Sequence, residues 1–133
     1  MPETVAIVAT YYERFNAGDF DGMLALLTDD VVHDINQGGR EVGKAAFAAF
    51  MARMQVAYRE TLRDVTIMVA ADGTRAAAEF VVHGTYLQAD EGMPPARGQA
   101  YVLPAGAFLT LRDGKIARVS MYYNLAQWLR QVA

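Results

Sequence analysis

Two Asp-Gly pairs in the second half of the chain restrict its fold more than any other feature. Asp72-Gly73 and Asp113-Gly114 each separate two runs in which apolar and polar residues alternate. Asp-Gly is a preferred pair for the two-residue turn that joins antiparallel strands. The sequence therefore predicts a meander of four antiparallel strands. The first covers residues 65–69, the second runs from the first turn to about Leu87, and the last two cover residues 98–111 and 115–124.

Pro104 and Gly106 fall inside the third of these predicted strands. Proline cannot donate to a strand ladder, and a glycine inside a strand is typical of a bulge or a bend. We therefore expect a bulge or a bend near these residues, and a bend would allow the sheet to curl.

The rest of the chain has apolar residues at helical spacing. Three helices are predicted before the sheet: one that ends at Gly18, a short one capped by Asp19, and one whose apolar stripe runs from Phe47 to Tyr58. A short amphipathic helix follows the sheet, with one face formed by Leu125, Trp128, Leu129 and Val132. This order predicts a single α+β domain over residues 1–133, with three N-terminal helices packed on one face of a curled antiparallel sheet.

The composition excludes several classes of function. The 12 Lys and Arg residues are scattered and are outnumbered by 15 Asp and Glu, so nucleic acid is not an expected partner. The chain has no cysteine, its two histidines lack a neighbouring ligand motif, and it has no glycine-rich phosphate loop, so we expect neither a metal nor a cofactor. No apolar run reaches transmembrane length and no basic leader precedes the first apolar segment. The expected location is the cytoplasm, without membrane contact.

The first strand-like run carries an acidic residue in its middle. After a turn at Asp29-Asp30, strand alternation places Asp34 on one side together with Asn36, and His33 on the other. We expect Asp34 and Asn36 to face inward and His33 to face outward. An inward carboxylate in an apolar pocket would have a raised pKa and could remove a proton next to a carbonyl group. The alternative is a structural carboxylate, which caps a neighbouring backbone turn or pairs with an arginine such as Arg40.

Four short motifs, in this order, carry a resemblance to a known family. They are YYERFNAGD (residues 11–19), LLTDDVVHD (26–34), GKAAF (43–47) and DGKI (113–116). Together they resemble the superfamily of nuclear transport factor 2, ketosteroid isomerase and the SnoaL-like polyketide cyclases, and the likeness covers nearly the whole chain. The segment 98–128 is most similar to the SnoaL-like, ketosteroid isomerase-related group. The resemblance implies a cone-shaped fold with an interior pocket, and a homodimer.

The same resemblance implies roles for individual residues. Tyr11 stands where the isomerases have an oxyanion-hole tyrosine, seven residues before the glycine that ends the first helix, although a buried tyrosine is equally often part of a core. Asp34 matches the aspartate that acts as their general base. Their second oxyanion donor is an aspartate, but Ala105-Gly106-Ala107 has no acid at the corresponding place, which leaves Gln99 or Tyr101 as a substitute donor.

Two hypotheses for the function follow. The first is a cofactor-independent isomerase or polyketide cyclase, in which Asp34 moves a proton α to a carbonyl and Tyr11 stabilises the enolate. The alternative is a non-catalytic module that binds a small ligand or serves as a dimeric scaffold, which the missing second acid favours. In both cases the aromatic content indicates a small apolar ligand that contains a carbonyl. The residues expected to bind it are Asn36, Gln99, Tyr101, Tyr123 and Trp128.

Overall fold

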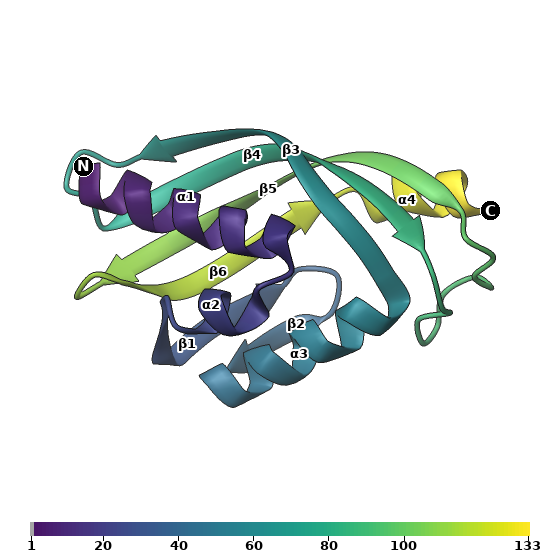
Figure 1. Ribbon diagram of the computed structural model, residues 1–133, viewed down its shortest axis with the longest axis horizontal. Helices are drawn as coiled ribbons and strands as arrows, with labels where there is room; N and C mark the ends of the chain where they lie inside the picture. The colour runs from purple at the N-terminus through teal and green to yellow at the C-terminus, as the bar shows by residue number, and fades with distance from the viewer. Residues whose placement is uncertain (1) are drawn as a thin grey trace.

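The computed structural model describes residues 2–133 and has the predicted α+β architecture (Figure 1). Its elements are α1 (Pro2–Ala17), α2 (Phe20–Leu24), β1 (Leu27–Ile35), β2 (Gly39–Val42), α3 (Lys44–Ala57), β3 (Tyr58–Val69), β4 (Arg75–Tyr86), β5 (Ala100–Arg112), β6 (Lys115–Tyr123) and α4 (Leu125–Val132). Helices α1, α2 and α3 lie on one face of the curled sheet, and α4 lies at one end of it. Within residues 2–133, no helix combines the length and the apolar character needed to cross a membrane.

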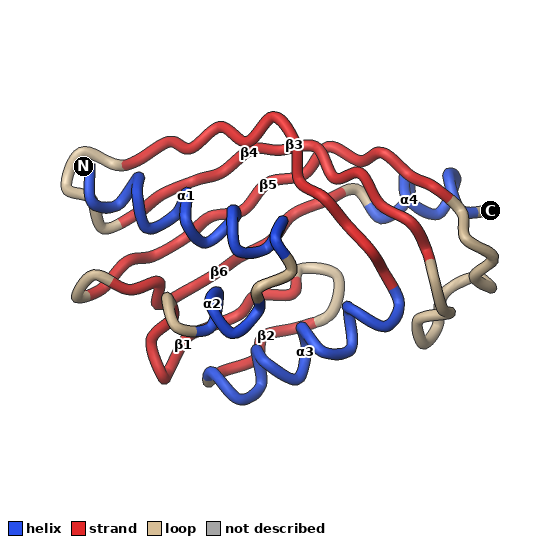
Figure 2. Tube along the Cα trace, in the orientation of Figure 1, coloured by secondary structure: helices blue, strands red, loops and turns tan. Residues whose placement is uncertain are grey.

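The strands form one six-stranded sheet in the order β2-β1-β6-β5-β4-β3 (Figure 2). The predicted meander is confirmed, because β3, β4, β5 and β6 pair antiparallel in sequence order. One strand pair departs from the predicted antiparallel pairing, since β1 pairs parallel with β6. The short edge strand β2 was not predicted. Tyr58 begins β3 instead of extending the preceding helix, so this strand starts earlier than the sequence suggested.

The β4–β5 pairing has no bulge at Pro104 and Gly106, where a bulge or a bend was expected. The register between β4 and β5 continues without a shift through Pro104 and Gly106. Pairing with β6 ends at Ala105, so Pro104 has a neighbouring strand on one side only, where proline is tolerated. Register shifts occur in three other places: between Leu27 and Val32 in the β1–β6 pairing, between Thr110 and Leu111 in the β5–β6 pairing, and in β3 between Arg63 and Thr66. The shift in β3 surrounds Asp64, which has a positive φ of 55°. An irregularity of this kind increases the local twist, and β3 bends strongly along its length (Figure 2).

The core lies between the helices and the concave face of the sheet. Its largest buried side chains include Val8, Tyr12, Met23, Phe47, Phe80, Leu109 and Ile116. Asn16 fixes the end of α1 against β3, because its side-chain amide donates to the Leu62 carbonyl at 2.9 Å and its side-chain oxygen accepts from the Leu62 N–H at 2.8 Å. The end of the helix is therefore held next to the bend in β3.

Candidate functional site

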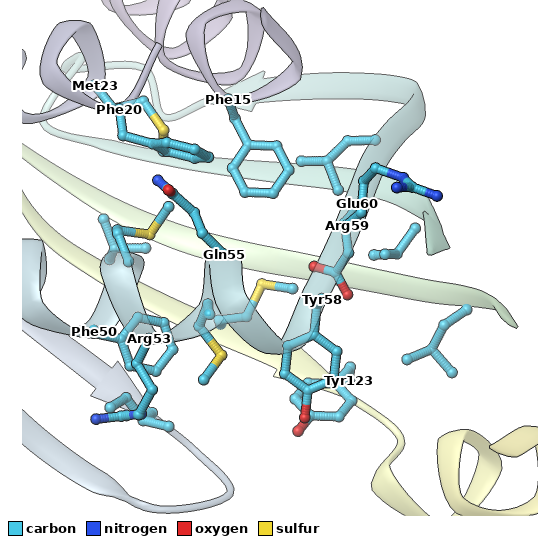
Figure 3. Close-up of a pocket in the computed structure, with 18 of the residues that line it drawn as sticks. Phe15, Phe20, Met23, Phe50, Arg53, Gln55, Tyr58, Arg59, Glu60 and Tyr123 are labelled. Carbon is cyan, nitrogen blue, oxygen red and sulfur yellow. The ribbon is translucent and has the colours of Figure 1, made fainter. Parts of the chain in front are cut away.

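A cavity of about 980 Å³ lies between the three N-terminal helices and the concave face of the sheet. Its wall is mainly apolar and is rich in aromatic and thioether side chains, among them Phe15, Phe20, Met23 and Phe50 (Figure 3). Met51 and Trp128 also line it. This volume is at the upper end of the range for sites that hold drug-sized molecules. The fold therefore provides a pocket for a small, predominantly apolar ligand.

Glu60 is a carboxylate in this apolar wall. Alternation along β3 brings Glu60 to the inner face between Tyr58 and Leu62. In Figure 3 its carboxylate lies between the rings of Phe15 and Tyr58. Burial raises the pKa of Glu60, and the hydrogen bond from the Tyr101 hydroxyl to Oε2, at 2.5 Å, opposes part of this rise. A carboxylate with these surroundings is poised to accept a proton closer to neutral pH than an exposed one.

Gly84 makes the contact between Tyr101 and Glu60 possible. Glu60 on β3 pairs with Gly84 on β4, which in turn pairs with Tyr101 on β5, so the three residues form a row across the sheet. A methyl group on Gly84 would overlap the ring and the hydroxyl of Tyr101. The Tyr101 ring therefore lies across the glycine and reaches Glu60 over it.

Tyr58 and Tyr123 line the same cavity as Glu60. Tyr58 stacks on Tyr86, with ring centres 5.5 Å apart, and its hydroxyl donates to Asp90 Oδ2 at 2.8 Å. Tyr86 also holds the loop between β4 and β5, since its hydroxyl donates to the Pro94 carbonyl and accepts from the Asp90 N–H. Burial raises the pKa of Tyr58 and of Tyr123, so both hydroxyls keep their protons and remain hydrogen-bond donors.

The expected inward position and raised pKa of Asp34 are both wrong. Its carboxylate accepts from Arg40 Nε at 2.6 Å and from Arg118 Nε at 2.9 Å, and these guanidinium groups, Arg40 above all, lower its pKa. Val31 is completely buried beneath the helices, so alternation places Asp34 on the opposite face of β1. Asp34 does not line the cavity. The alternative of a carboxylate paired with Arg40 describes its surroundings.

His33 faces the cavity, so its expected outward position is also wrong. It is 5% exposed and packs between Phe47 and Phe50, with ring centres 4.6 Å away in each case. Its Nδ1 is enclosed and has no hydrogen-bond partner. Burial lowers the pKa of the imidazole, so the ring is neutral at pH 7. The packing of Val31 and His33 in the folded core, not the charge of Asp34, decides which side of this strand faces inward.

Of the six other residues expected at the site, four line the cavity and two do not. Tyr11, Asn36, Tyr123 and Trp128 line the cavity. The Asn36 amide is already engaged, since it donates to Met121 O at 2.6 Å and to Ser120 Oγ at 3.1 Å. Burial raises the pKa of Tyr11 well above its ordinary value, so it stays protonated.

Gln99 and Tyr101 lie behind the wall of the cavity. The Gln99 amide donates to the carbonyls of Pro95 and Val132 and thereby ties the β4–β5 loop to α4. Tyr101 reaches the site through its bond to Glu60. The ligand-binding roles expected for these residues, and for those that line the cavity, remain predictions.

Sequence reasoning did not identify Glu60. The signal was present, because Tyr58, Glu60 and Leu62 alternate with polar residues in the period of a strand. Assigning Tyr58 to the preceding helix concealed that pattern. Within residues 2–133, no group of three or more His, Cys, Asp or Glu side chains could hold a metal ion.

Comparisons with known proteins agree with this fold. The family model of the SnoaL-like domain matches residues 8–119. Among proteins with curated functions, none matches the chain significantly. A crystal structure of a candidate polyketide cyclase from Pseudomonas putida KT2440 is 62% identical, with a TM-score of 0.94 and 96% of each chain covered.

Two further crystal structures extend the comparison. A candidate polyketide cyclase from Xanthomonas campestris is 55% identical, with a TM-score of 0.96, and the match covers 99% of this chain and 98% of that one. A protein from Burkholderia pseudomallei that resembles nuclear transport factor 2 and has no known function is 18% identical, with a TM-score of 0.78 and coverage of 100% and 99%. At that identity the likeness shows the fold alone, which is the cone-shaped fold expected from the sequence.

Proposed function

We propose that this chain, which belongs to the SnoaL-like domain family, is a cofactor-independent enzyme in which Glu60 moves a proton next to a carbonyl group of a small apolar ligand. The observation that carries the proposal is the carboxylate of Glu60 inside the apolar cavity, with its pKa raised by burial and its orientation fixed by Tyr101. A general base works best when its pKa lies near the operating pH. Glu60 therefore replaces Asp34 as the candidate base.

The reaction begins when the Glu60 carboxylate removes a proton from the carbon α to the carbonyl. The electron pair of the broken C–H bond forms an enolate, whose oxygen needs hydrogen-bond donors. Tyr11 and Tyr123 line the cavity with protonated hydroxyls and are the candidate donors. Tyr101 stays on Glu60 and holds the carboxylate in place.

The enolate then has two fates. In an isomerisation, Glu60 returns the proton to a different carbon and the double bond shifts. In a cyclisation, the enolate carbon attacks a second carbonyl carbon of the same ligand, a C–C bond forms, and the resulting alkoxide takes the proton from Glu60. The similarity to candidate polyketide cyclases at 62% and 55% identity favours cyclisation.

A chromogenic base-promoted reaction tests Glu60 without knowledge of the natural ligand. 5-Nitrobenzisoxazole opens when a base removes its ring proton, and the phenolate product is followed by absorbance. Because a positioned general base contributes about 10²- to 10⁴-fold, we expect Glu60→Gln to lose at least about 100-fold in kcat/KM. The matched control is Asp34→Asn, which removes the carboxylate on the opposite face and should change kcat/KM by less than about threefold.

The conversion of a β,γ-unsaturated ketosteroid to its conjugated isomer provides a second substrate for the same variants. An unchanged rate in Glu60→Gln, or a large loss in Asp34→Asn, would contradict the proposal. A wild-type protein that binds flat ketones without turning over either substrate would support the alternative, a non-catalytic binding module.

We also propose that the chain forms a homodimer through the outer face of the sheet. Val102, Phe108 and Tyr122 are exposed on strands β5 and β6, and the last two form an aromatic pair with ring centres 5.5 Å apart. Exposed apolar groups of this kind favour contact with a second copy. Light scattering on the wild type and on Phe108→Asp tests this, and an unchanged mass in the variant would contradict it.

A single domain over residues 1–133 and a cytoplasmic location complete the proposal. Limited proteolysis tests the single domain, and cell fractionation tests the location.

A further inference from the structure

We propose that His33 is a second polar contact for the ligand, that it accepts a hydrogen bond from a ligand hydroxyl group, and that Glu41 holds its ring in the required state. This role rests on the proposed function and narrows the ligand class to carbonyl compounds that also carry a hydroxyl. Glu41 would act only through His33, as a positioning residue.

The first observation is a pair of complementary polar atoms without partners. His33 on β1 and Glu41 on β2 are directly opposite each other in the antiparallel register, which places both side chains on one face with Cβ atoms roughly 5 Å apart. His33 Nδ1 and Glu41 Oε1 are both enclosed, and neither has a hydrogen-bond partner. Buried polar atoms are rarely left unpaired, because the loss of water contacts is costly. A hydrogen bond from Nδ1–H to the Glu41 carboxylate would satisfy both atoms at once.

The carboxylate decides which ring nitrogen carries the proton. A neighbouring carboxylate favours the tautomer with the proton on Nδ1, since the other tautomer would point a lone pair at a negative charge. The charges of Glu41 and Asp34 favour the imidazolium, but burial outweighs them. On the side of α3, Arg53 lies over the Phe50 ring, 5.3 Å from its centre, and Phe50 in turn packs against the imidazole.

The second observation is which nitrogen of the imidazole ring faces the cavity. His33 lines the cavity, and its Nδ1 is enclosed, so Nε2 is the nitrogen that can meet a ligand. In the neutral Nδ1–H tautomer, Nε2 has a lone pair and no proton. It can therefore accept a hydrogen bond and cannot donate one. A ligand hydroxyl fits this position, whereas a second carbonyl or an ether oxygen leaves Nε2 unpaired.

The tautomer is measured without any ligand by nitrogen-15 NMR of the imidazole rings. The chain has two histidines, so His83→Gln assigns the spectrum. We expect His33 to carry its proton on Nδ1 in the wild type and to shift toward the Nε2–H tautomer in Glu41→Met, which keeps the side-chain length and removes the acceptor. Asp34→Asn is the matched control, since it removes a carboxylate next in sequence but on the opposite face, and it should leave the tautomer unchanged. A wild-type Nε2–H tautomer, or no shift in Glu41→Met, overturns the role of Glu41.

Recognition of the hydroxyl is measured by calorimetry with 2-naphthol and 2-methoxynaphthalene, which differ in whether their oxygen carries a proton. We expect the wild type to bind 2-naphthol about tenfold more tightly, the effect of one good hydrogen bond. His33→Phe should bind the two probes equally, and it should fold because the ring packs between Phe47 and Phe50. Equal affinities or no binding in the wild type, or a preference that survives in His33→Phe, overturns the proposal.

Glu60→Gln separates this inference from the proposed function. The variant should lose proton transfer and keep the preference for 2-naphthol. If the preference for 2-naphthol depends on Glu60 instead of His33, the hydroxyl contact is not made by His33 and the inference is overturned. If Glu60→Gln retains proton transfer while the preference still depends on His33, the proposed function fails and the hydroxyl contact stands.

Discussion

Asp34 and Glu60 are carboxylates on opposite faces of the same sheet, and their surroundings shift their pKa values in opposite directions. On the outer face, Asp34 is 8% exposed and is bonded to two guanidinium groups, which lower its pKa. On the concave face, Glu60 opens onto a cavity and is bonded to one neutral hydroxyl, and its pKa is raised.

The comparison shows that the partner of a carboxylate, more than its burial, decides what chemistry it can perform. Cationic partners stabilise the charged form of Asp34 and make it a poor base. An apolar wall and a phenol stabilise the charge of Glu60 much less, so its affinity for a proton rises. A covered carboxylate is therefore a candidate base only if no cation neutralises it.

The acid limb of the pH–rate profile is the strongest test of which of the two carboxylates acts as the base. A base must be ionised, so the rate with 5-nitrobenzisoxazole should fall about tenfold per pH unit below the pKa of the group responsible. If that group is Glu60, the midpoint lies above the ordinary value of 4.5. If it were Asp34, the midpoint would lie below 3.8. The assay is run with circular dichroism at each pH, and a midpoint below 3.8 in folded protein would return the role to Asp34.

Gly84→Ala should have the next largest effect, a loss of stability, because the added methyl group displaces Tyr101 from its place over the glycine. Overpacking of this kind costs about 1 to 3 kcal/mol, and we expect the upper half of that range in the free energy of unfolding. Gly39→Ala is the matched control on β2, since a Cβ there meets no atom within 4 Å, and it should change stability by less than about 0.5 kcal/mol. Urea denaturation measures both variants, and equal midpoints would show that Tyr101 does not depend on Gly84.

Removing each carboxylate should change stability at pH 7 in opposite directions. The lowered pKa of Asp34 means that its ion pairs stabilise the fold above pH 3.8 and that this contribution is lost as pH falls through the lower, folded-state pKa. The raised pKa of Glu60 means that its favourable contribution is present below pH 4.5, in the protonated form, and is lost as pH rises through the folded-state pKa.

Asp34→Asn should therefore lower the free energy of unfolding at pH 7 by about 1 kcal/mol, a small cost because Arg40 keeps contact with water. Glu60→Gln should raise it by about 1 kcal/mol, since the variant buries no charge. Thermal unfolding at pH 7 compares the two variants with the wild type. The same sign of change in both would contradict the assignment of opposite environments.

Particular elements explain what sequence reasoning could and could not predict. The hairpins at Asp72-Gly73 and Asp113-Gly114 were predictable because the turn preference is local, and both are confirmed. The side of β1 that faces inward was not, because alternation gives two equivalent faces and the choice depends on which neighbours Val31 meets across the sheet. The row Glu60–Gly84–Tyr101 joins three strands, so no local pattern in the sequence brings it together.

Tyr101→Phe should have the smallest effect, and it tests most directly the hydrogen bond between Tyr101 and Glu60. The hydroxyl of Tyr101 stabilises the charged form of Glu60, so its removal should raise the Glu60 pKa further and move the acid limb of the rate profile to higher pH. The ring remains to cover Gly84, so the fold should be retained. Carbon-13 NMR of the Glu60 carboxyl group measures the shift directly, with Tyr123→Phe as the control for loss of a hydroxyl that no bond joins to Glu60 within residues 2–133. A lower Glu60 pKa in Tyr101→Phe would mean that the glutamate donates to the tyrosine, and that the protonated acid is the form the site holds.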